Sequence, residues 1–225
     1  MALIFHYHPL SSFCQKVLIA LYENGTAFEG RIVDLGDPAE RTRYLDISPL
    51  GKIPALQDDG RAVIETSIQI EYLEQHHPGA RPLLPRDPAR RLDARLWDRL
   101  FDLYVEVPMQ KIVGDRLRPD DERDARGVAE ARAGLKAAYP MIERHLSGRT
   151  WAVGEAFGIA DCAAAPGLFF ASMLEPFTAY PNLDGYFERL LARPSFDRVL
   201  REARPFFPHF PYYGDMPERF RRWGL

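Results

Sequence analysis

The sequence predicts an α/β domain followed by an all-α domain. In the first 80 residues, short runs of β-type residues alternate with segments of helical period. Beyond residue 88, every segment has helical period and the strand signals vanish. Four prolines between residues 78 and 88 cannot continue a helix and are typical of a linker. We therefore expect a first domain over residues 1–80, a linker over 81–88 and a helical domain over 89–225.

The first domain is expected to have the element order βαβ and then αββα. Strands are expected over residues 3–7, within 28–35, at the end of 48–56 and over 62–64. Helices are expected from residue 13 to a stop at Gly25, over 39–45, and from residue 65 onward. The Asp-Asp-Gly sequence at 58–60 is typical of a hairpin turn. In the helix that begins at residue 65, Ile68 and Tyr72 are expected to face inward, with Leu73 as a further candidate.

The second domain is expected to be a set of amphipathic helices. Their expected ranges are 90–107, 121–146, 159–174 and 183–191. Pro140 is expected to kink or break the second of these helices. The tail over residues 204–225 holds seven aromatic residues and four prolines, so a helix throughout the tail is not expected.

Composition excludes several classes of protein. Hydrophobic residues make up 46% and charged residues 27% of the 225 residues, which is ordinary globular composition. A net charge of −3 lacks the basic excess of a nucleic-acid binder. Two cysteines cannot form a disulfide framework, no Cys/His cluster has zinc-like spacing, and no apolar run approaches the ~18 residues of a membrane span. Because nothing resembles a signal peptide either, we expect a reduced, cytoplasmic protein without a metal.

Four segments together resemble motifs of one known family. They cover residues 9–17, 48–56, 64–73 and 157–161, and they occur in the right order. With them the chain resembles the cytosolic glutathione S-transferase family, in its serine-type, bacterial-like form. The resemblance implies a thioredoxin-like, glutathione-binding first domain and a helical second domain. Asp161 would belong to a folding motif of the family rather than to its chemistry.

The resemblance also implies a set of residues that bind glutathione. Ile53-Pro54 would be the family's cis-proline segment, whose backbone pairs with the cysteinyl part of glutathione. Glu65 and Thr66 would receive the γ-glutamyl end, where helix N–H groups and the dipole converge. Thr66 is also suited to cap that helix. Lys52 would reach the glycyl carboxylate.

The expected catalytic residue is a serine at the start of the first helix. In serine-type members this hydroxyl donates a hydrogen bond to the glutathione sulfur and stabilises the thiolate. Ser11 and Cys14 hold the two positions of a thioredoxin-type CxxC, so Ser11 is the first candidate and Ser12 the second. One of the two serines must also cap the helix. Cys14 shares a stripe with apolar residues and is expected to be core, although a redox role stays open.

The second substrate is expected to be a small hydrophobic electrophile. Its pocket would lie between the domains, below the aromatic tail, and its candidate lining residues are Phe13, Tyr104, Pro108, Met109 and Ile112. The expected function is therefore a glutathione transferase with a role in detoxification. A glutathione-dependent isomerase, a thiol–disulfide oxidoreductase or a non-catalytic glutathione-binding protein on the same scaffold are the alternatives. By the same resemblance we expect a homodimer, with no nucleic acid or membrane as partner.

Overall fold

A four-stranded sheet forms the centre of the first domain. The structure, a computed structural model, describes residues 3–225. The strands are β1 (Ile4–Tyr7), β2 (Glu29–Ile32), β3 (Ala55–Asp58) and β4 (Arg61–Val63). Their order in the sheet is β2-β1-β3-β4, with β1 and β2 parallel and the other two pairs antiparallel. All four expected strands are therefore present.

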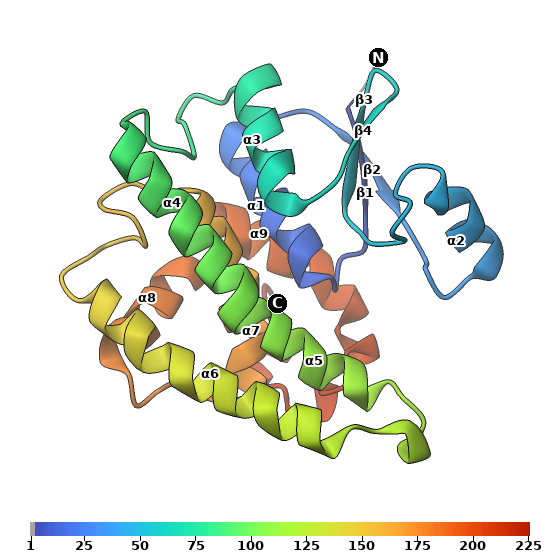
Figure 1. Ribbon diagram of the computed structural model, residues 1–225, viewed down its shortest axis with the longest axis vertical. Helices are drawn as coiled ribbons and strands as arrows, with labels where there is room; N and C mark the ends of the chain where they lie inside the picture. Colours follow the sequence, from blue (N-terminus) through green and yellow to red (C-terminus); the bar gives the residue numbers. More distant parts are fainter. Residues whose placement is uncertain (1–2) are drawn as a thin grey trace.

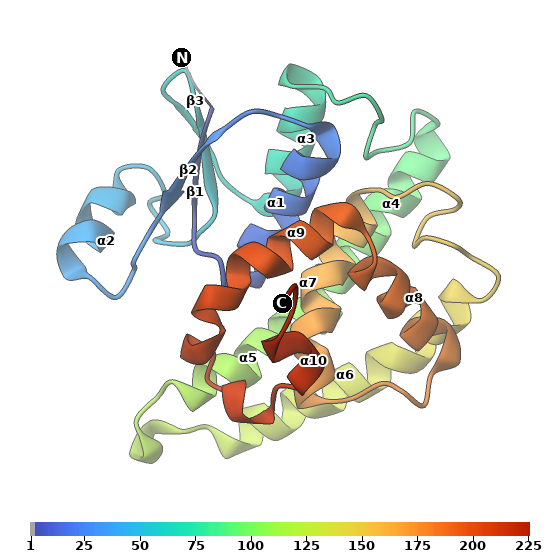
Figure 2. The same cartoon turned by 180° about the vertical axis from the view of Figure 1, so that it is seen from behind.

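Three helices cover the two faces of this sheet. They are α1 (Ser12–Asn24), α2 (Pro38–Leu45) and α3 (Thr66–His76). Figures 1 and 2 show α1 and α3 on the face that is turned toward the helical domain, with α2 on the opposite side. Gly25 ends α1 in the left-handed conformation, at φ +66°, and its N–H bonds the carbonyl groups of Leu21 and Tyr22. The βαβ and αββα order that the sequence predicts is confirmed.

One face of α3 differs from the expectation. Ile68 is 56% exposed, whereas Gln69, Ile70 and Leu73 are buried. The buried side chain of Gln69 donates from Nε2 to the carbonyl of Pro54 at 2.8 Å. A polar residue thus occupies the core face, which an apolar period alone does not reveal.

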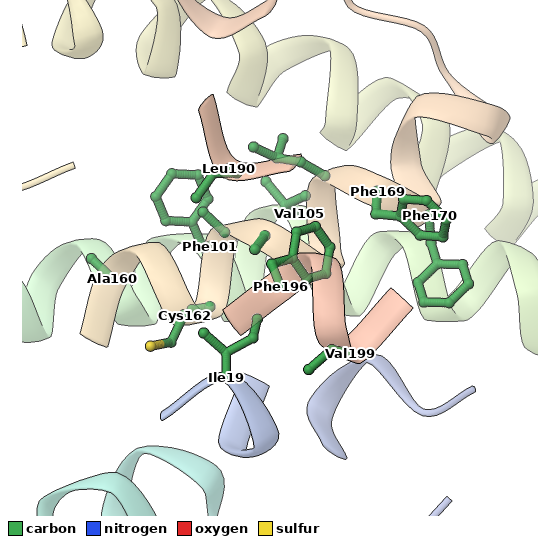
Figure 3. Close-up of a cluster of buried hydrophobic side chains, with 14 of the residues drawn as sticks. Ile19, Phe101, Val105, Ala160, Cys162, Phe169, Phe170, Leu190, Phe196 and Val199 are labelled. Atoms are coloured by element: carbon green, nitrogen blue, oxygen red, sulfur yellow. The ribbon is translucent and has the colours of Figure 1, made fainter. Parts of the chain in front are cut away.

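The helical domain is built around α7. Its elements are α4 (Pro88–Phe101), a π-helical turn η1 (Asp102–Glu106), α5 (Val107–Arg116), α6 (Ala125–Leu146), α7 (Ile159–Leu174), α8 (Pro181–Leu191), α9 (Pro194–Ala203) and α10 (Glu218–Arg221). Short 3-10 segments lie at Asp120–Glu122, Arg204–His209 and Tyr213–Asp215. Nearly every residue of α7 is buried. Figure 3 shows side chains of α7 in one cluster with those of neighbouring helices: Cys162, Phe169 and Phe170 lie with Ile19 of α1 and with Phe196 and Val199 of α9.

Three features of this domain correct the sequence analysis. The helix expected over 90–107 becomes π-helical from Asp102, and it is followed by α5, which was not expected. The break expected at Pro140 is absent, because α6 continues through it with buried residues in both halves, among them Leu135 and Ile142. Helix α9 was not expected, although Phe196, Val199, Leu200 and Ala203 repeat with helical spacing on its buried face.

The C-terminal tail packs on α7 through aromatic rings. Phe207 and Phe220 both contact the ring of Phe169, and Phe210 contacts Phe170. Figure 2 shows this last stretch of chain on the side of the molecule where α9 lies. No helix within residues 3–225 has both the length and the apolar character that crossing a membrane requires.

Asp161 has the folding role that the sequence predicts. It accepts hydrogen bonds from the backbone N–H groups of Gly158 and Ala152 at 2.8 and 2.9 Å, and from the hydroxyl of Tyr186 at 2.6 Å. The first of these bonds is half of a capping box at the start of α7. Burial raises the pKa of Asp161 to about 6, although these three donors oppose the shift.

A buried ionic cluster joins the two domains. Lys16 of α1 places its Nζ 2.7 Å from Asp98 of α4 and 2.8 Å from Asp102 of η1. Lys16 Nζ also donates to the hydroxyl of Ser67 at 3.1 Å, and that hydroxyl donates to Asp98. Burial lowers the pKa of Lys16, but the two aspartates outweigh it and the net shift is upward. The cluster fixes α1 and the start of α3 against α4.

Candidate functional site

The residues expected to bind glutathione line one cavity, which we call the clamp cavity. It has a volume of about 310 Å³. Its walls include all five of the expected residues, namely Lys52, Ile53, Pro54, Glu65 and Thr66. The Ile53–Pro54 peptide bond is cis, as expected. Arg99 and Asp102 also line this cavity, and the sequence analysis missed them because they come from the far side of the linker.

Glu65 holds an unusual backbone conformation at the edge of the clamp cavity. Its φ of +67° lies in the left-handed region, which a residue other than glycine rarely adopts. Glu65 occupies the N-cap position of α3, but no side-chain hydrogen bond caps this helix. Thr66 is the first helical residue and is buried, so the capping role expected of it is wrong. Such local strain is found at ligand sites, where the surrounding structure enforces it.

A second cavity, which we call the serine cavity, lies beside the first. It has a volume of about 500 Å³, and both Ser11 and Ser12 line it. Ile53 and Gln110 line both cavities. The remaining walls are mostly apolar and come from both domains and from the tail, including Val33, Leu35, Met109, Val113, Leu117, Phe170, Phe210 and Pro211. The two cavities therefore adjoin at Ile53 and Gln110.

The two serines differ in their hydrogen bonds. Ser11 is the N-cap of α1, and its Oγ accepts from the backbone N–H of Cys14 at 3.4 Å. Accepting this bond leaves the Ser11 hydroxyl hydrogen available for donation. Ser12 is buried, and its Oγ accepts from Gln110 Nε2 at 3.3 Å. The cap and the first catalytic candidate are therefore the same residue, Ser11.

Cys14 is a buried thiol. It is fully buried, and burial raises its pKa to about 12, although the hydrogen bonds of Ser11 and of the His8 backbone oppose this shift. The thiolate is the reactive form of cysteine, so this environment suppresses reaction at neutral pH. The redox role left open for Cys14 is disfavoured by this environment.

Besides Gln110, three polar residues that the sequence analysis missed line the serine cavity: His8, Asp34 and His209. His8 Nδ1 accepts from the backbone N–H of Leu10 at 3.2 Å, which assigns the ring proton to Nε2 in the neutral form. Burial lowers the pKa of His8, Asp34 raises it, and His209 lowers it further. His8 directly follows β1, and its position at a strand end was the signal that could have identified it.

Most of the residues that were expected to line the electrophile pocket lie outside the serine cavity. Met109 lines it, and Phe13 lines the clamp cavity instead. Neither cavity is lined by Tyr104, Pro108 or Ile112. Tyr104 is 53% exposed, Pro108 is half-buried and Ile112 is buried. The expectation rested on the family resemblance, and a regular helix would place residues 104, 108 and 112 on one face. The π-helical turn adds a residue, so the face at the cavity is formed one position later, by Met109, Gln110, Val113, Gly114 and Leu117.

Among residues 3–225, no group of three or more His, Cys, Asp or Glu side chains is arranged to hold a metal ion.

Family models match both domains. Residues 5–81 match the glutathione S-transferase N-terminal domain, and residues 105–194 match the glutathione S-transferase C-terminal domain. The chain belongs to the glutathione S-transferase family. This family assignment agrees with the α/β and helical architecture and with the resemblance found in the sequence.

Individual family members are similar along most of their length. A probable maleylacetoacetate isomerase of Caenorhabditis elegans is 30% identical over 199 residues, which are 87% of this chain and 91% of that protein. Glutathione S-transferase U25 of Arabidopsis thaliana is 30% identical over 208 residues, 89% of this chain and 90% of that protein. A solved glutathione S-transferase of Methylobacterium radiotolerans, in complex with glutathione sulfonate, is 32% identical with a TM-score of 0.78, covering 88% of this chain and 94% of that one.

Proposed function

We propose that this family member is a glutathione transferase. Glutathione binds in the clamp cavity, and its thiolate attacks a small hydrophobic electrophile held in the serine cavity. The observation that carries the proposal is the junction of the two cavities at Ile53 and Gln110, next to the serines. A tripeptide whose central residue pairs with Ile53 brings its thiol to this junction. The solved relative in complex with glutathione sulfonate supports glutathione as the ligand.

Ser11 is the proposed catalytic residue. A free thiol has a pKa of ~8.5, so glutathione must be held as thiolate to react at neutral pH. Lowering the thiol pKa by about two units requires about 2.7 kcal/mol of preferential thiolate binding. Ser11 supplies a hydroxyl donor at the positive end of α1, and the thiol proton leaves to solvent. Ser12 remains the second candidate for the sulfur contact.

Glutathione-dependent isomerisation is the second candidate function. It is favoured by the similarity to a protein described as a probable maleylacetoacetate isomerase. In that reaction the same thiolate adds to the substrate and leaves again, so glutathione is regenerated. A thiol–disulfide oxidoreductase is disfavoured, because the fully buried Cys14 thiol has its pKa raised to about 12.

A calorimetric titration with glutathione, followed by three activity assays, tests the proposal. The assays measure conjugation to a generic chloronitrobenzene, turnover of an isomerisable substrate and reduction of a disulfide. The proposal requires binding of glutathione together with its consumption in the first assay. Absence of glutathione binding would overturn it, and turnover in the second assay alone would select the isomerase.

Replacement of Glu65 should weaken glutathione binding. Glu65→Ala removes the carboxylate proposed to face the ammonium group of glutathione, and a lost charged hydrogen bond costs about 1.5–3 kcal/mol. This corresponds to a roughly 10- to 150-fold rise in Kd, measured by calorimetry. Glu130→Ala, on the exposed face of α6 and outside both cavities, is the matched control. An unchanged Kd for Glu65→Ala would remove Glu65 from the site.

The chain is also proposed to form a homodimer with twofold symmetry, the commonest closed symmetry of soluble oligomers. Light scattering at micromolar concentration should give twice the mass of one chain. A monomer mass across that concentration range would refute the dimer and leave the proposed chemistry unaffected, because both cavities are built from a single chain.

A further inference from the structure

His8 contributes an imidazole side chain to the wall of the serine cavity. The residue directly follows β1 and is half-buried. It lines the serine cavity together with Ser11, and it does not line the clamp cavity. A ligand of the serine cavity, and not one held between the clamp residues, therefore meets this side chain.

The turn between β1 and α1 holds the ring of His8 in place. The backbone N–H of His8 donates to Cys14 Sγ at 3.5 Å, and its carbonyl accepts from the N–H of Ser11 at 3.0 Å. The ring accepts at Nδ1 from the N–H of Leu10 at 3.2 Å. It also makes an edge-to-face contact with Phe206 of the tail, at 5.5 Å between ring centroids. His8 and Ser11 thus belong to one hydrogen-bonded turn, which fixes their positions relative to each other.

The hydrogen bond from Leu10 determines which ring nitrogen of His8 carries the proton. A backbone N–H can only donate, so Nδ1 is the acceptor and has no hydrogen. The ring is therefore neutral, with its single proton on Nε2. Burial acts in the same direction, because it lowers the pKa of His8, although Asp34 opposes this shift.

The Nε2–H group of His8 makes no hydrogen bond within residues 3–225. It is also not one of the enclosed side-chain atoms that lack a partner, so it is open to solvent. Asp34 Oδ1 accepts instead from the N–H of Gly36 at 2.8 Å. No hydrogen bond joins Asp34 or His209 to the His8 ring in the described part of the chain. A neutral N–H donor in a mostly apolar wall is thus left for a ligand.

We propose that His8 is a catalytic residue that selects electrophiles whose attacked carbon is conjugated to a carbonyl group, and that its Nε2–H donates to the carbonyl oxygen. A donor suits this class of electrophile because the oxygen gains negative charge only when the sulfur attacks. A donor that is already in place stabilises the transition state more than the uncharged substrate. The proposal rests on the proposed function, since it requires the glutathione thiolate in the same site.

The addition to such an enone balances without a further reactant from the protein. The thiolate sulfur forms a bond to the β-carbon, and the electron pair of the C=C bond moves toward the carbonyl, which becomes an enolate. The α-carbon then takes a proton from water, in place of the proton that the glutathione thiol released to solvent. His8 keeps its proton throughout and acts only as a hydrogen-bond donor.

The ratio of kcat/KM for two electrophiles tests the role of His8. Benzylideneacetone is an aromatic enone, whereas benzyl chloride has an aromatic ring and no carbonyl. His8→Asn keeps an acceptor for the N–H of Leu10, because asparagine bonds the backbone two residues on, but its side chain is too short to replace Nε2. This variant should lower the ratio of enone to chloride roughly ten- to hundredfold.

Two further variants control this experiment. His8→Gln has a longer side chain that ends in an N–H donor, so it should restore part of the ratio. His76→Asn replaces an exposed histidine of α3 outside both cavities and should keep the ratio of the unmodified protein. An unchanged ratio in His8→Asn overturns the proposal.

Two measurements on the donor do not require glutathione. Benzylacetone is the saturated ketone and cannot be attacked, so its Kd is measured by calorimetry. Its Kd should rise about three- to tenfold in His8→Asn, as expected for one lost hydrogen bond. In the unmodified protein, NMR of the histidine ring nitrogens should show a bare Nδ1 and a protonated Nε2, whose signal shifts when benzylacetone is added. A proton on Nδ1, or an equal Kd in His8→Asn, overturns the proposal. Failed glutathione binding, with both results as expected, overturns the proposed function and leaves the His8 donor in place.

Discussion

Ser11→Ala is expected to lower the conjugation rate at neutral pH roughly ten- to hundredfold while leaving glutathione affinity nearly intact. The clamp cavity is unchanged by this substitution, but the thiolate loses the hydroxyl donor at the start of α1. The thiol pKa in the complex should rise by one to two units, which is about 1.4–2.7 kcal/mol of lost preference for the charged sulfur. The rate should recover as pH is raised. The measurement is the ultraviolet absorbance of the bound thiolate against pH, together with kcat.

Two companion variants separate Ser11 from its neighbours. Ser12→Ala should shift the thiolate titration less than Ser11→Ala does, because Ser12 is buried whereas Ser11 is the N-cap at the start of α1. Cys14→Ala should cost stability without changing the titration, since the thiol is enclosed in the core. If Ser12→Ala shifts the thiolate titration more than Ser11→Ala does, Ser12 is the residue that contacts the sulfur. If Cys14→Ala alone abolishes turnover, the protein is a thiol–disulfide enzyme.

Lys16→Met should destabilise the fold by about 3–5 kcal/mol. It removes the cation from a buried cluster and leaves Asp98 and Asp102 as adjacent carboxylates that are 1% and 3% exposed. Because the cluster connects α1 with α4 and η1, both domains should unfold at lower denaturant concentration. Chemical denaturation followed by tryptophan fluorescence measures the loss, since Trp97 of α4 is buried in the core.

Two further variants show whether the unpaired charge is the cause. Arg126→Ala removes one member of an exposed ion pair with Glu130 and should cost less than 1 kcal/mol. Adding Asp98→Asn and Asp102→Asn to Lys16→Met should recover part of the lost stability, because no buried charge is then left unpaired. If Lys16→Met and Arg126→Ala lowered the free energy of unfolding equally, the buried cluster would contribute no more to stability than an exposed ion pair.

The elements with local signals could be predicted from the sequence. Helix α7 spans Ile159–Leu174, the same range that the apolar pattern indicates, and each strand lies where β-type residues are bounded by turn residues. The five clamp residues come from two motifs, and the fold brings both motifs to one cavity. These features depend on short-range patterns or on a family motif.

The features that escaped prediction depend on tertiary packing. Gln69 lies in the core because the Pro54 carbonyl is there to accept its hydrogen bond. The face of α5 that lines the serine cavity depends on η1, whose extra residue no periodicity of 3.6 detects. Glu106 is buried, and its carboxyl lies close to Gly167 of α7, which is far from it in the sequence. Each of these features depends on a contact between residues that are far apart in the sequence, so local sequence patterns could not predict it.

The π-helical turn also sets which side chains of α5 form the lining of the serine cavity. It holds one residue more than an α-helical turn, so the same residues in a regular α-helix would place every later residue of α5 about 100° away around the helix axis relative to α4. Met109 and Gln110 would then leave the cavity wall, and Pro108 and Ile112 would approach it. Deleting one codon within Asp102–Glu106 removes the extra residue, so the shorter chain should form a regular helix and keep its lining face. In evolution, a deletion confined to this turn is therefore expected to conserve the substrate range, whereas a deletion later in α5 would change the lining positions that follow it all at once.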